Sequence, residues 1–190
     1  MKNIVFIYLI LNSSIYCSSQ IPGFFVAKEW SKEIALFQSK AHLCKHILGI
    51  DPSVVKFEVL PLAAASSGDL TSLWYNCTSK KMEGLLLAFY GNYWNDQGVL
   101  YQGFAFRNFV KSEAIEFLNL IQKNIDDNIT YLREDPDNTN IYFSYKDMDV
   151  MVWSSSYHLF KIRLFWNGFD STWEKLSFER SKQRFEKSIK

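Results

Sequence analysis

The chain has 190 residues, and its 21 basic and 20 acidic side chains leave a formal net charge of +1. That balance lacks the basic surplus of a nucleic-acid-binding surface, so we expect no nucleic-acid partner. Aromatic residues make up 17% of the chain, a proportion that is typical either of a strand-rich core or of an exposed aromatic ligand-binding surface.

The first residues have the pattern of a secretory signal peptide. Lys2 precedes an apolar run over 4–11, and small polar residues follow. The run is much shorter than the roughly twenty apolar residues that a membrane-spanning helix needs. We therefore expect cleavage between Ser19 and Gln20, and an exported mature protein, periplasmic or secreted, with one α+β domain at 20–190. The alternative is a lipoprotein anchored at Cys17, although bulky Tyr16 precedes that cysteine where such signals have a small residue.

Two cysteines, Cys44 and Cys77, remain after signal-peptide removal. In an oxidising compartment, two cysteines in a small domain are compatible with a disulfide. Closing the loop between them would stabilise the fold by roughly 3–4 kcal/mol through the unfolded state. The alternative is two free buried thiols.

A helix is predicted over 28–48, because apolar residues recur there at spacings of three and four. Gly49 ends it, and Asp51 and Pro52 prevent its continuation. The same stripe predicts that Cys44 points inward. Its members are Trp30, Ile34, Phe37, Ala41, Cys44 and Leu48.

Four antiparallel strands are predicted next, over 54–65, 70–77, 85–93 and 99–109. These segments are rich in β-branched, aromatic and aliphatic residues, and short polar turns separate them. Short connections of this kind join neighbouring antiparallel strands.

A second long helix is expected to begin after Ser112 as its N-cap, with acidic residues in its first turns. Two strands, 141–153 and 157–167, and a final basic helix over 173–188 follow it. The final helix has a thin apolar stripe of Phe178, Phe185 and Ile189. The expected buried face of the second helix comprises Ala114, Phe117, Leu118, Ile121, Ile125, Ile129 and Leu132.

The predicted element order is therefore α-ββββ-α-ββ-α. It indicates an α+β fold with a single antiparallel sheet of about six strands and helices packed mainly on one face.

Asp147 and Asp149 form a D-x-D pair that is common in metal and acid/base sites. A hairpin with Trp153 opposite Tyr157 would instead place Asp149 opposite Lys161 and Asp147 opposite Arg163, as stabilising ion pairs. The same register places the apolar residues of both strands together on the other face. Because one register explains both faces, we favour ion pairs over a metal site. That core face comprises Met148, Val150, Val152, Phe160, Ile162, Leu164 and Trp166.

His42 and His46 have the one-turn spacing that lets two imidazoles share a metal. Residue 43 is leucine rather than the glutamate of an H-E-x-x-H motif, and His158 is far away in the chain. We therefore interpret the pair as surface histidines and expect no metal and no cofactor. Cys44 lies on a different helical face from both, which argues against a Cys–His nucleophile.

Two clusters combine aromatic side chains with amides and carboxylates, as sugar- or peptide-binding surfaces do. The alternative is that the tryptophans close the ends of the core while the polar residues shape turns. The candidate ligand-binding residues are Tyr93, Trp94, Asn95 and Asp96 in the first cluster, and Trp166, Asn167, Asp170 and Trp173 in the second.

These features predict an exported, non-catalytic binding or accessory protein of the cell envelope or extracellular space. It would dock a protein or carbohydrate on the sheet face that helices leave open, or at the aromatic clusters. One alternative is a secreted hydrolase that uses carboxylates, and another is an inhibitor or immunity-type protein. The carboxylates of the hydrolase hypothesis are Asp96, Asp147, Asp149 and Asp170.

Overall fold

The structure is a computed structural model, and no helix that it describes is long and apolar enough to span a membrane. The signal-peptide prediction at 1–19 and the candidate residues Asn95 and Asp96 lie outside the described residues, as do the side chains of Tyr93 and Trp94. The described ranges are 25–26, 31–49, 51–64, 69–94, 100–155 and 159–189.

The strands form two antiparallel sheets. The first sheet has the order β1-β5-β4-β3-β2, and the second has the order β6-β7-β8-β9. The strands of the first sheet are β1 (Phe25–Val26), β2 (Glu58–Ala64), β3 (Leu70–Cys77), β4 (Met82–Trp94) and β5 (Leu100–Val110). Those of the second are β6 (Asn140–Tyr145), β7 (Met148–Ser154), β8 (Phe160–Trp166) and β9 (Phe169–Glu174).

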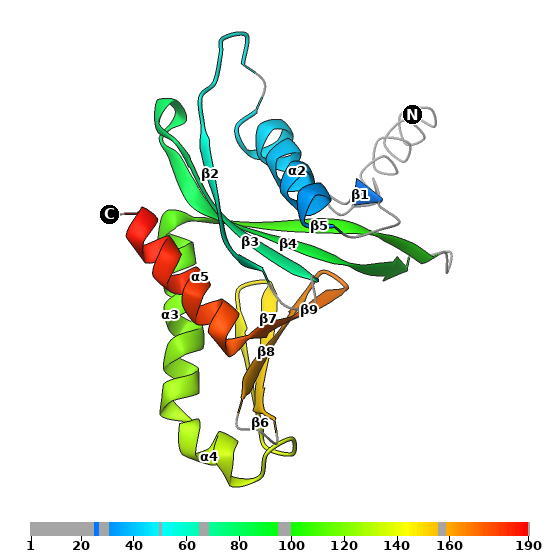
Figure 1. Ribbon diagram of the computed structural model, residues 1–190, viewed down its shortest axis with the longest axis vertical. Helices are drawn as coiled ribbons and strands as arrows, with labels where there is room; N and C mark the ends of the chain where they lie inside the picture. The colour runs from blue at the N-terminus through cyan, green and yellow to red at the C-terminus, as the bar shows by residue number, and fades with distance from the viewer. Residues whose placement is uncertain are drawn as a thin grey trace, which may run out of the picture.

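The helices lie on both sides of the first sheet. Helix α2 lies on one side of it, whereas α3, α5 and the second sheet lie on the other (Figure 1). The helical elements are α2 (Lys32–His42), the π-helical turn η1 (Leu43–Ile47), the 3-10 turn η2 (Thr78–Lys80), α3 (Lys111–Asp127), α4 (Ile129–Glu134) and α5 (Lys175–Ser188).

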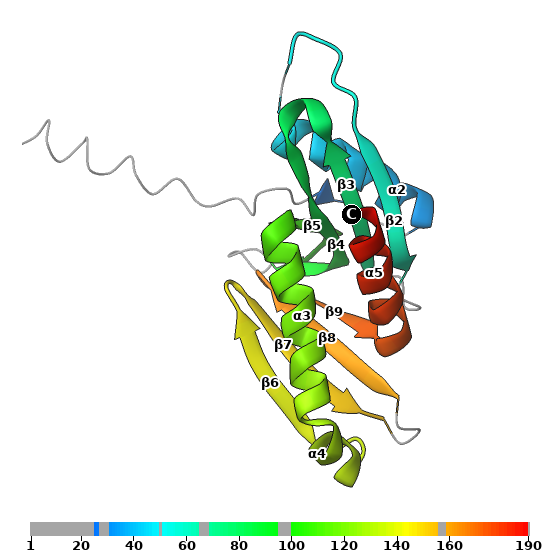
Figure 2. The same ribbon diagram turned by 90° about the vertical axis from the view of Figure 1, so that its left-hand side faces the viewer.

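Burial along the strands reflects this arrangement. Strand β3 is buried almost continuously, because layers cover both faces of the first sheet. Strands β7 and β8 alternate between buried and partly exposed residues. Figure 2 shows α3 lying across one face of the second sheet. The alternation of β7 and β8 therefore indicates that the opposite face is open.

The two sheets share a larger core with α3 and α5, and a smaller core fills the space between the first sheet and α2. The core face predicted for 148–166 is confirmed, since each of its members is at most 9% exposed and belongs to the larger core.

The prediction of a single six-stranded sheet is wrong. Residues 141–153 are not one strand, because Lys146 takes a positive φ of 55° and turns the chain between β6 and β7. Trp173, where the last helix is expected to begin, belongs instead to β9. This strand follows a turn at Asn167 and Gly168, which have φ values of 52° and 81°. Four consecutive strands after α4 then pair with one another and form a separate sheet.

The buried face of the second helix is confirmed: its predicted residues are buried, apart from a partly buried Ile129. Ser112 is not its N-cap, because α3 begins at Lys111 after Val110. The helix also breaks at Asn128, whose φ of −116° separates α3 from α4.

The predicted buried face of the first helix is wrong at Ile34, Phe37 and Cys44, although Leu48 is buried; Trp30 lies outside the described residues. Ile34 and Phe37 are 37% and 67% exposed, whereas Ala35, Ser39 and His42 are buried. A stripe of similar spacing, shifted around the helix, faces the sheet. The π-helical turn then widens the helix over Leu43–Ile47, and Cys44 is exposed rather than inward.

A candidate binding surface on the second sheet

The side of the second sheet that faces away from α3 forms one continuous surface, which we call the open face. It consists of alternate side chains of β6, β7, β8 and β9, placed side by side by the strand register. These residues are Asn140, Tyr142 and Ser144 on β6, Asp149, Met151 and Trp153 on β7, Lys161, Arg163 and Phe165 on β8, and Asp170, Thr172 and Glu174 on β9.

The register between β7 and β8 differs from the predicted one. Trp153 lies opposite Lys161 rather than Tyr157. The last pair is Ser154 with Phe160, so five residues rather than three connect the strands, and the partner of Trp153 moves four residues along the chain. Asp149 consequently lies opposite Phe165, and Arg163 lies opposite Met151. The shift is an even number of residues, so the side chains of β7 and β8 keep their predicted faces of the sheet.

Four large apolar side chains lie on the open face. Tyr142 is 64% exposed, and Met151, Trp153 and Phe165 are partly exposed. None of the four belongs to either core among the described residues. Unlike the inward-facing residues, they leave apolar area in contact with solvent, which is the property that marks interaction surfaces.

Three charged groups of the open face, Arg163, Asp170 and Asp149, bond to neighbouring side chains. The Arg163 guanidinium donates to Thr172 Oγ1 at 2.6 Å and forms an ion pair with Asp170. Asp149 accepts a hydrogen bond from Ser144 Oγ at 2.6 Å. This bond, followed by one from the Tyr142 hydroxyl, lowers the pKa of Asp149. The face therefore combines apolar area with an arginine–aspartate ion pair and a hydrogen-bonded carboxylate.

Asp147 lies beside this surface, in the turn between β6 and β7, and links the second sheet to the first. Arg107 of β5 donates to Asp147 Oδ1 through Nη2 at 2.8 Å and through Nε at 3.1 Å. The Trp166 indole donates to Asp147 Oδ2 at 2.9 Å. Partial burial opposes ionisation, but these bonds and the Arg107 charge outweigh it and lower the pKa of Asp147. Asp147 therefore bonds to Arg107 and Trp166 rather than to Arg163, its predicted partner.

The second predicted aromatic–polar cluster is divided by the structure. Trp166 and Trp173 are 9% and 1% exposed and point into the larger core. Asn167 occupies the tight turn between β8 and β9, and Asp170 lies on the open face. Only Asp170 of this cluster contributes to the surface described above.

Cys44 and Cys77 are both free thiols. Cys44 is exposed on η1, whereas Cys77 is buried at the end of β3, where its Sγ lies 3.5 Å from the Lys56 carbonyl oxygen. The predicted bridge is therefore not present in the structure.

The interpretation of His42 and His46 as surface residues is wrong for His42, the last residue of α2. Its ring is 9% exposed and stacks on Phe106 and on His46, with centroids 4.5 and 4.8 Å away. Burial, and secondarily the nearby His46, lowers the pKa of His42 to about 4. Within the described part of the chain, no three histidine, cysteine or acidic side chains group closely enough to hold a metal.

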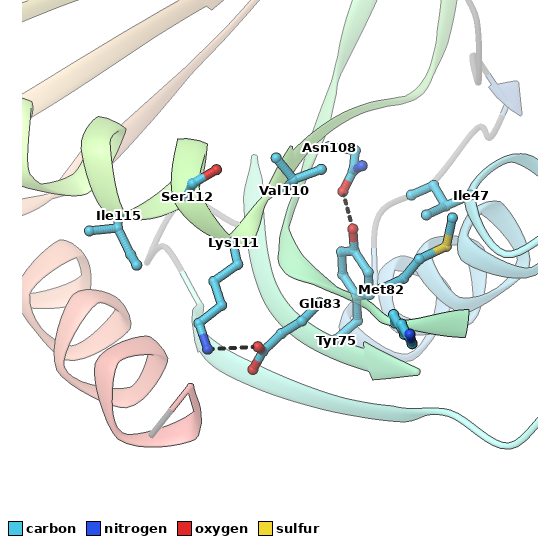
Figure 3. Close-up of a pocket in the computed structure, with 10 residues that line it drawn as sticks. Ile47, Tyr75, Met82, Glu83, Asn108, Val110, Lys111, Ser112 and Ile115 are labelled. Carbon is cyan, nitrogen blue, oxygen red and sulfur yellow. Dashed lines mark hydrogen bonds and ion pairs between the residues drawn. The ribbon is translucent and has the colours of Figure 1, made fainter. Parts of the chain in front are cut away.

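A depression of about 590 Å³ lies at one end of the first sheet, beside the first turn of α3 (Figure 3). Its polar groups bond to one another: the Tyr75 hydroxyl donates to Asn108 Oδ1 at 2.8 Å, and Lys111 Nζ lies 2.9 Å from Glu83 Oε2. Apolar residues such as Met82 and Ile115 form much of the remaining wall. Lys81 is a further charged residue of its lining. We regard the open face as the stronger candidate, because it carries a group of large apolar side chains outside both cores.

The fold and the open face together define the class of this protein: an α+β domain with two antiparallel sheets, one covered on both sides and one open on one side. Comparison with protein-family models, with curated protein sequences and with solved structures gives no match.

Most of the open face was not predicted, although part of its signal is present in the sequence. The alternation that defines the inner face of β7 and β8 also places Met151, Trp153 and Phe165 on the outer face. The contribution of β6 and β9 follows only from recognising the turns at Lys146 and Asn167.

Proposed function

We propose that this protein is an exported, non-catalytic binding protein that docks a partner on the open face of its second sheet. The observation that carries the proposal is the group of four large side chains on that face, one exposed and three partly exposed, which lie outside both cores. Apolar area bordered by paired charges is typical of protein–protein interfaces. A protein is therefore the favoured partner, and a carbohydrate that stacks on the aromatic rings is the alternative.

The described carboxylates support a binding role over the hydrolase alternative. A hydrolase of that kind needs two carboxyl groups that converge on one substrate bond. Asp147 instead bonds to Arg107 and Trp166, while Asp149 bonds to Ser144 across the strand pair. Asp170 is held by Arg163. Each of these groups has a structural partner, and Asp96 lies outside the described residues.

Affinity capture with matched variants tests the docking role. Met151→Glu places a carboxylate in the middle of the open face, directly opposite Arg163, so the new charge has a cross-strand partner and the fold is expected to tolerate it. Phe37→Glu is the control, because Phe37 is 67% exposed on α2, and α2 lies on the other side of the first sheet from the second sheet. Mature protein immobilised in its native extract should retain a partner that Phe37→Glu also retains and Met151→Glu loses.

Equal retention of every partner by the two variants would contradict docking on the open face. If the captured partner is an enzyme whose activity falls on binding, the same surface serves an inhibitor or immunity-type function.

Export is a separate part of the proposal, based on the charged start and short apolar run at the N-terminus. Intact-mass measurement of the protein from its native source should give a chain that begins at Gln20. A retained Met1 would overturn export by signal-peptide cleavage, and a diacylglyceryl group on Cys17 would show the lipoprotein alternative to be correct.

A further inference from the structure

Strand β6 forms an edge of the second sheet, and its outer side is uncovered (Figure 2). The other edge strands are protected. Strand β2 contains Pro61 and packs against α5, β9 packs against β4, and β1 is only two residues long. Covering, prolines and short length are the devices by which proteins prevent edge strands from pairing with other chains. Strand β6 has none of them.

The sequence of β6 also lacks the charged residues that usually protect an edge. It reads NIYFSY, without lysine, glutamate, aspartate or proline. Its side chains alternate between exposed residues on the open face and partly buried residues against the core. An uncharged aromatic strand of this kind is well suited to accept another strand.

The hairpin geometry shows which backbone groups are available. The two-residue turn closes on Tyr145 paired with Met148, and hydrogen-bonded pairs recur at every second residue of an antiparallel ladder. Ile141 and Phe143 therefore bond to β7, whereas the N–H and C=O groups of Tyr142 and Ser144 point away from it. Among the described residues, neither Tyr142 nor Ser144 has a backbone hydrogen bond outside the sheet ladders.

We propose that β6 pairs with β6 of a second copy of this chain, antiparallel and about a two-fold axis at Tyr142. This register sets Tyr142 opposite its own copy, Asn140 opposite Ser144, and Ile141 opposite Phe143. Polar residues then face polar residues on the open side, apolar residues face apolar residues on the core side, and no like charges meet. The same register gives every outward-pointing backbone group of Asn140, Tyr142 and Ser144 a partner.

The paired sheets form one continuous sheet, and the two open faces become one surface. A six-residue edge buries much less than the roughly 800 Å² per partner of a stable interface, so the dimer is reversible and depends on concentration. The pairing does not depend on what the open face binds, and it stands even if the docking proposal fails.

Sedimentation velocity over a concentration series tests the pairing. The wild-type protein should shift from monomer to dimer as its concentration rises. Tyr142→Lys should remain monomeric, because it places two positive charges against each other at the two-fold axis. Tyr142→Pro should also remain monomeric, because it removes an N–H that points outward and not one that bonds to β7. Tyr101→Lys, on β5 of the first sheet, is the matched control and should dimerise as the wild type does.

A cross-linking measurement decides the register, with Cys44→Ser as background because Cys44 is exposed. Tyr142→Cys should form a disulfide-linked dimer on mild oxidation, whereas Ser144→Cys, which lies opposite Asn140 in this register, should not. A wild-type protein that stays monomeric at every concentration would overturn the proposal. So would a dimer that Tyr142→Lys leaves unchanged, or one in which Ser144→Cys cross-links and Tyr142→Cys does not.

Discussion

The imidazole of His42 is buried between the ring of Phe106 and that of His46. Among the described residues, no carboxylate forms an ion pair with it. Burial is the larger cause of its low pKa, with the His46 charge second. Such a group is neutral in the folded protein and accepts a proton freely only after unfolding. The packing of α2 on the first sheet therefore depends on pH through this side chain.

The first prediction concerns the pH dependence of stability. Unfolded His42 titrates near pH 6.5, whereas in the folded protein its pKa is about 4. Between these values the unfolded chain binds a proton that the folded protein does not, so the free energy of unfolding decreases as the pH falls. The contribution is at most about 1.4 kcal/mol per pH unit. His42→Phe should reduce this loss between pH 7.5 and 5, as measured by urea unfolding at each pH.

His46→Gln is the control for that prediction. It removes the secondary cause and leaves the burial of His42, so most of the pH dependence should remain. Identical pH profiles for the wild type and His42→Phe would show that His42 does not control this part of the stability.

At the scale of elements, Gly84 shows how close packing fixes the strand β4. It pairs with Tyr75 on β3 and with Val110 on β5. The Tyr75 ring reaches past it to Asn108 on β5. A Cβ atom at position 84 would lie 2.2 Å from the Phe109 carbonyl oxygen and 2.8 Å from the Tyr75 hydroxyl oxygen. The close approach of these strands therefore requires glycine here.

The second prediction compares two glycines of the same strand. Gly84→Ala should lower the free energy of unfolding by about 2–4 kcal/mol, because backbone atoms must move to admit the methyl group. Gly91→Ala should cost less than about 1 kcal/mol, because among the described residues its Cβ would meet only Phe169 Cδ1, at 3.6 Å. Urea unfolding of both variants measures the difference, and similar costs would contradict the packing described around Gly84.

Elements with strong local signals could be predicted from the sequence. The buried face of α3 and the inner faces of β7 and β8 follow from simple periodicity and are correct. The turn at Asn167 and Gly168 has the Asn-Gly signature of a tight hairpin. The predicted elements instead place it between a strand and the final helix. The turn at Lys146 and Asp147 has no such signature. The length of the predicted strand over 141–153 does not indicate a hidden turn either, because β4 is a single strand of the same length.

Other features depend on tertiary contacts and have no local signal. The face of α2 is decided by what it meets on the first sheet, since two stripes of its sequence have helical spacing and only one packs against residues such as Phe106. The role of Asp147 depends on Arg107, which is 40 residues away in the chain. No pattern near the D-x-D pair identifies that partner.

At the scale of the whole molecule, the two sheets differ in what covers them. The first sheet is enclosed by α2 on one side and by α3, α5 and the second sheet on the other. The second sheet shares that core through one face and leaves the other open. The open face and the adjoining β6 edge together form the part of the described structure that is best suited to bind another molecule.

The most direct test of this account is the affinity of the captured partner, measured by titration calorimetry against wild type, Met151→Glu and Phe37→Glu. The account predicts that Met151→Glu weakens binding by at least about tenfold, or 1.4 kcal/mol, because it places a charge in the apolar centre of the open face. Phe37→Glu should bind as the wild type does. Unchanged affinity for Met151→Glu, with weaker binding of Phe37→Glu, would contradict it and place the docking surface on α2.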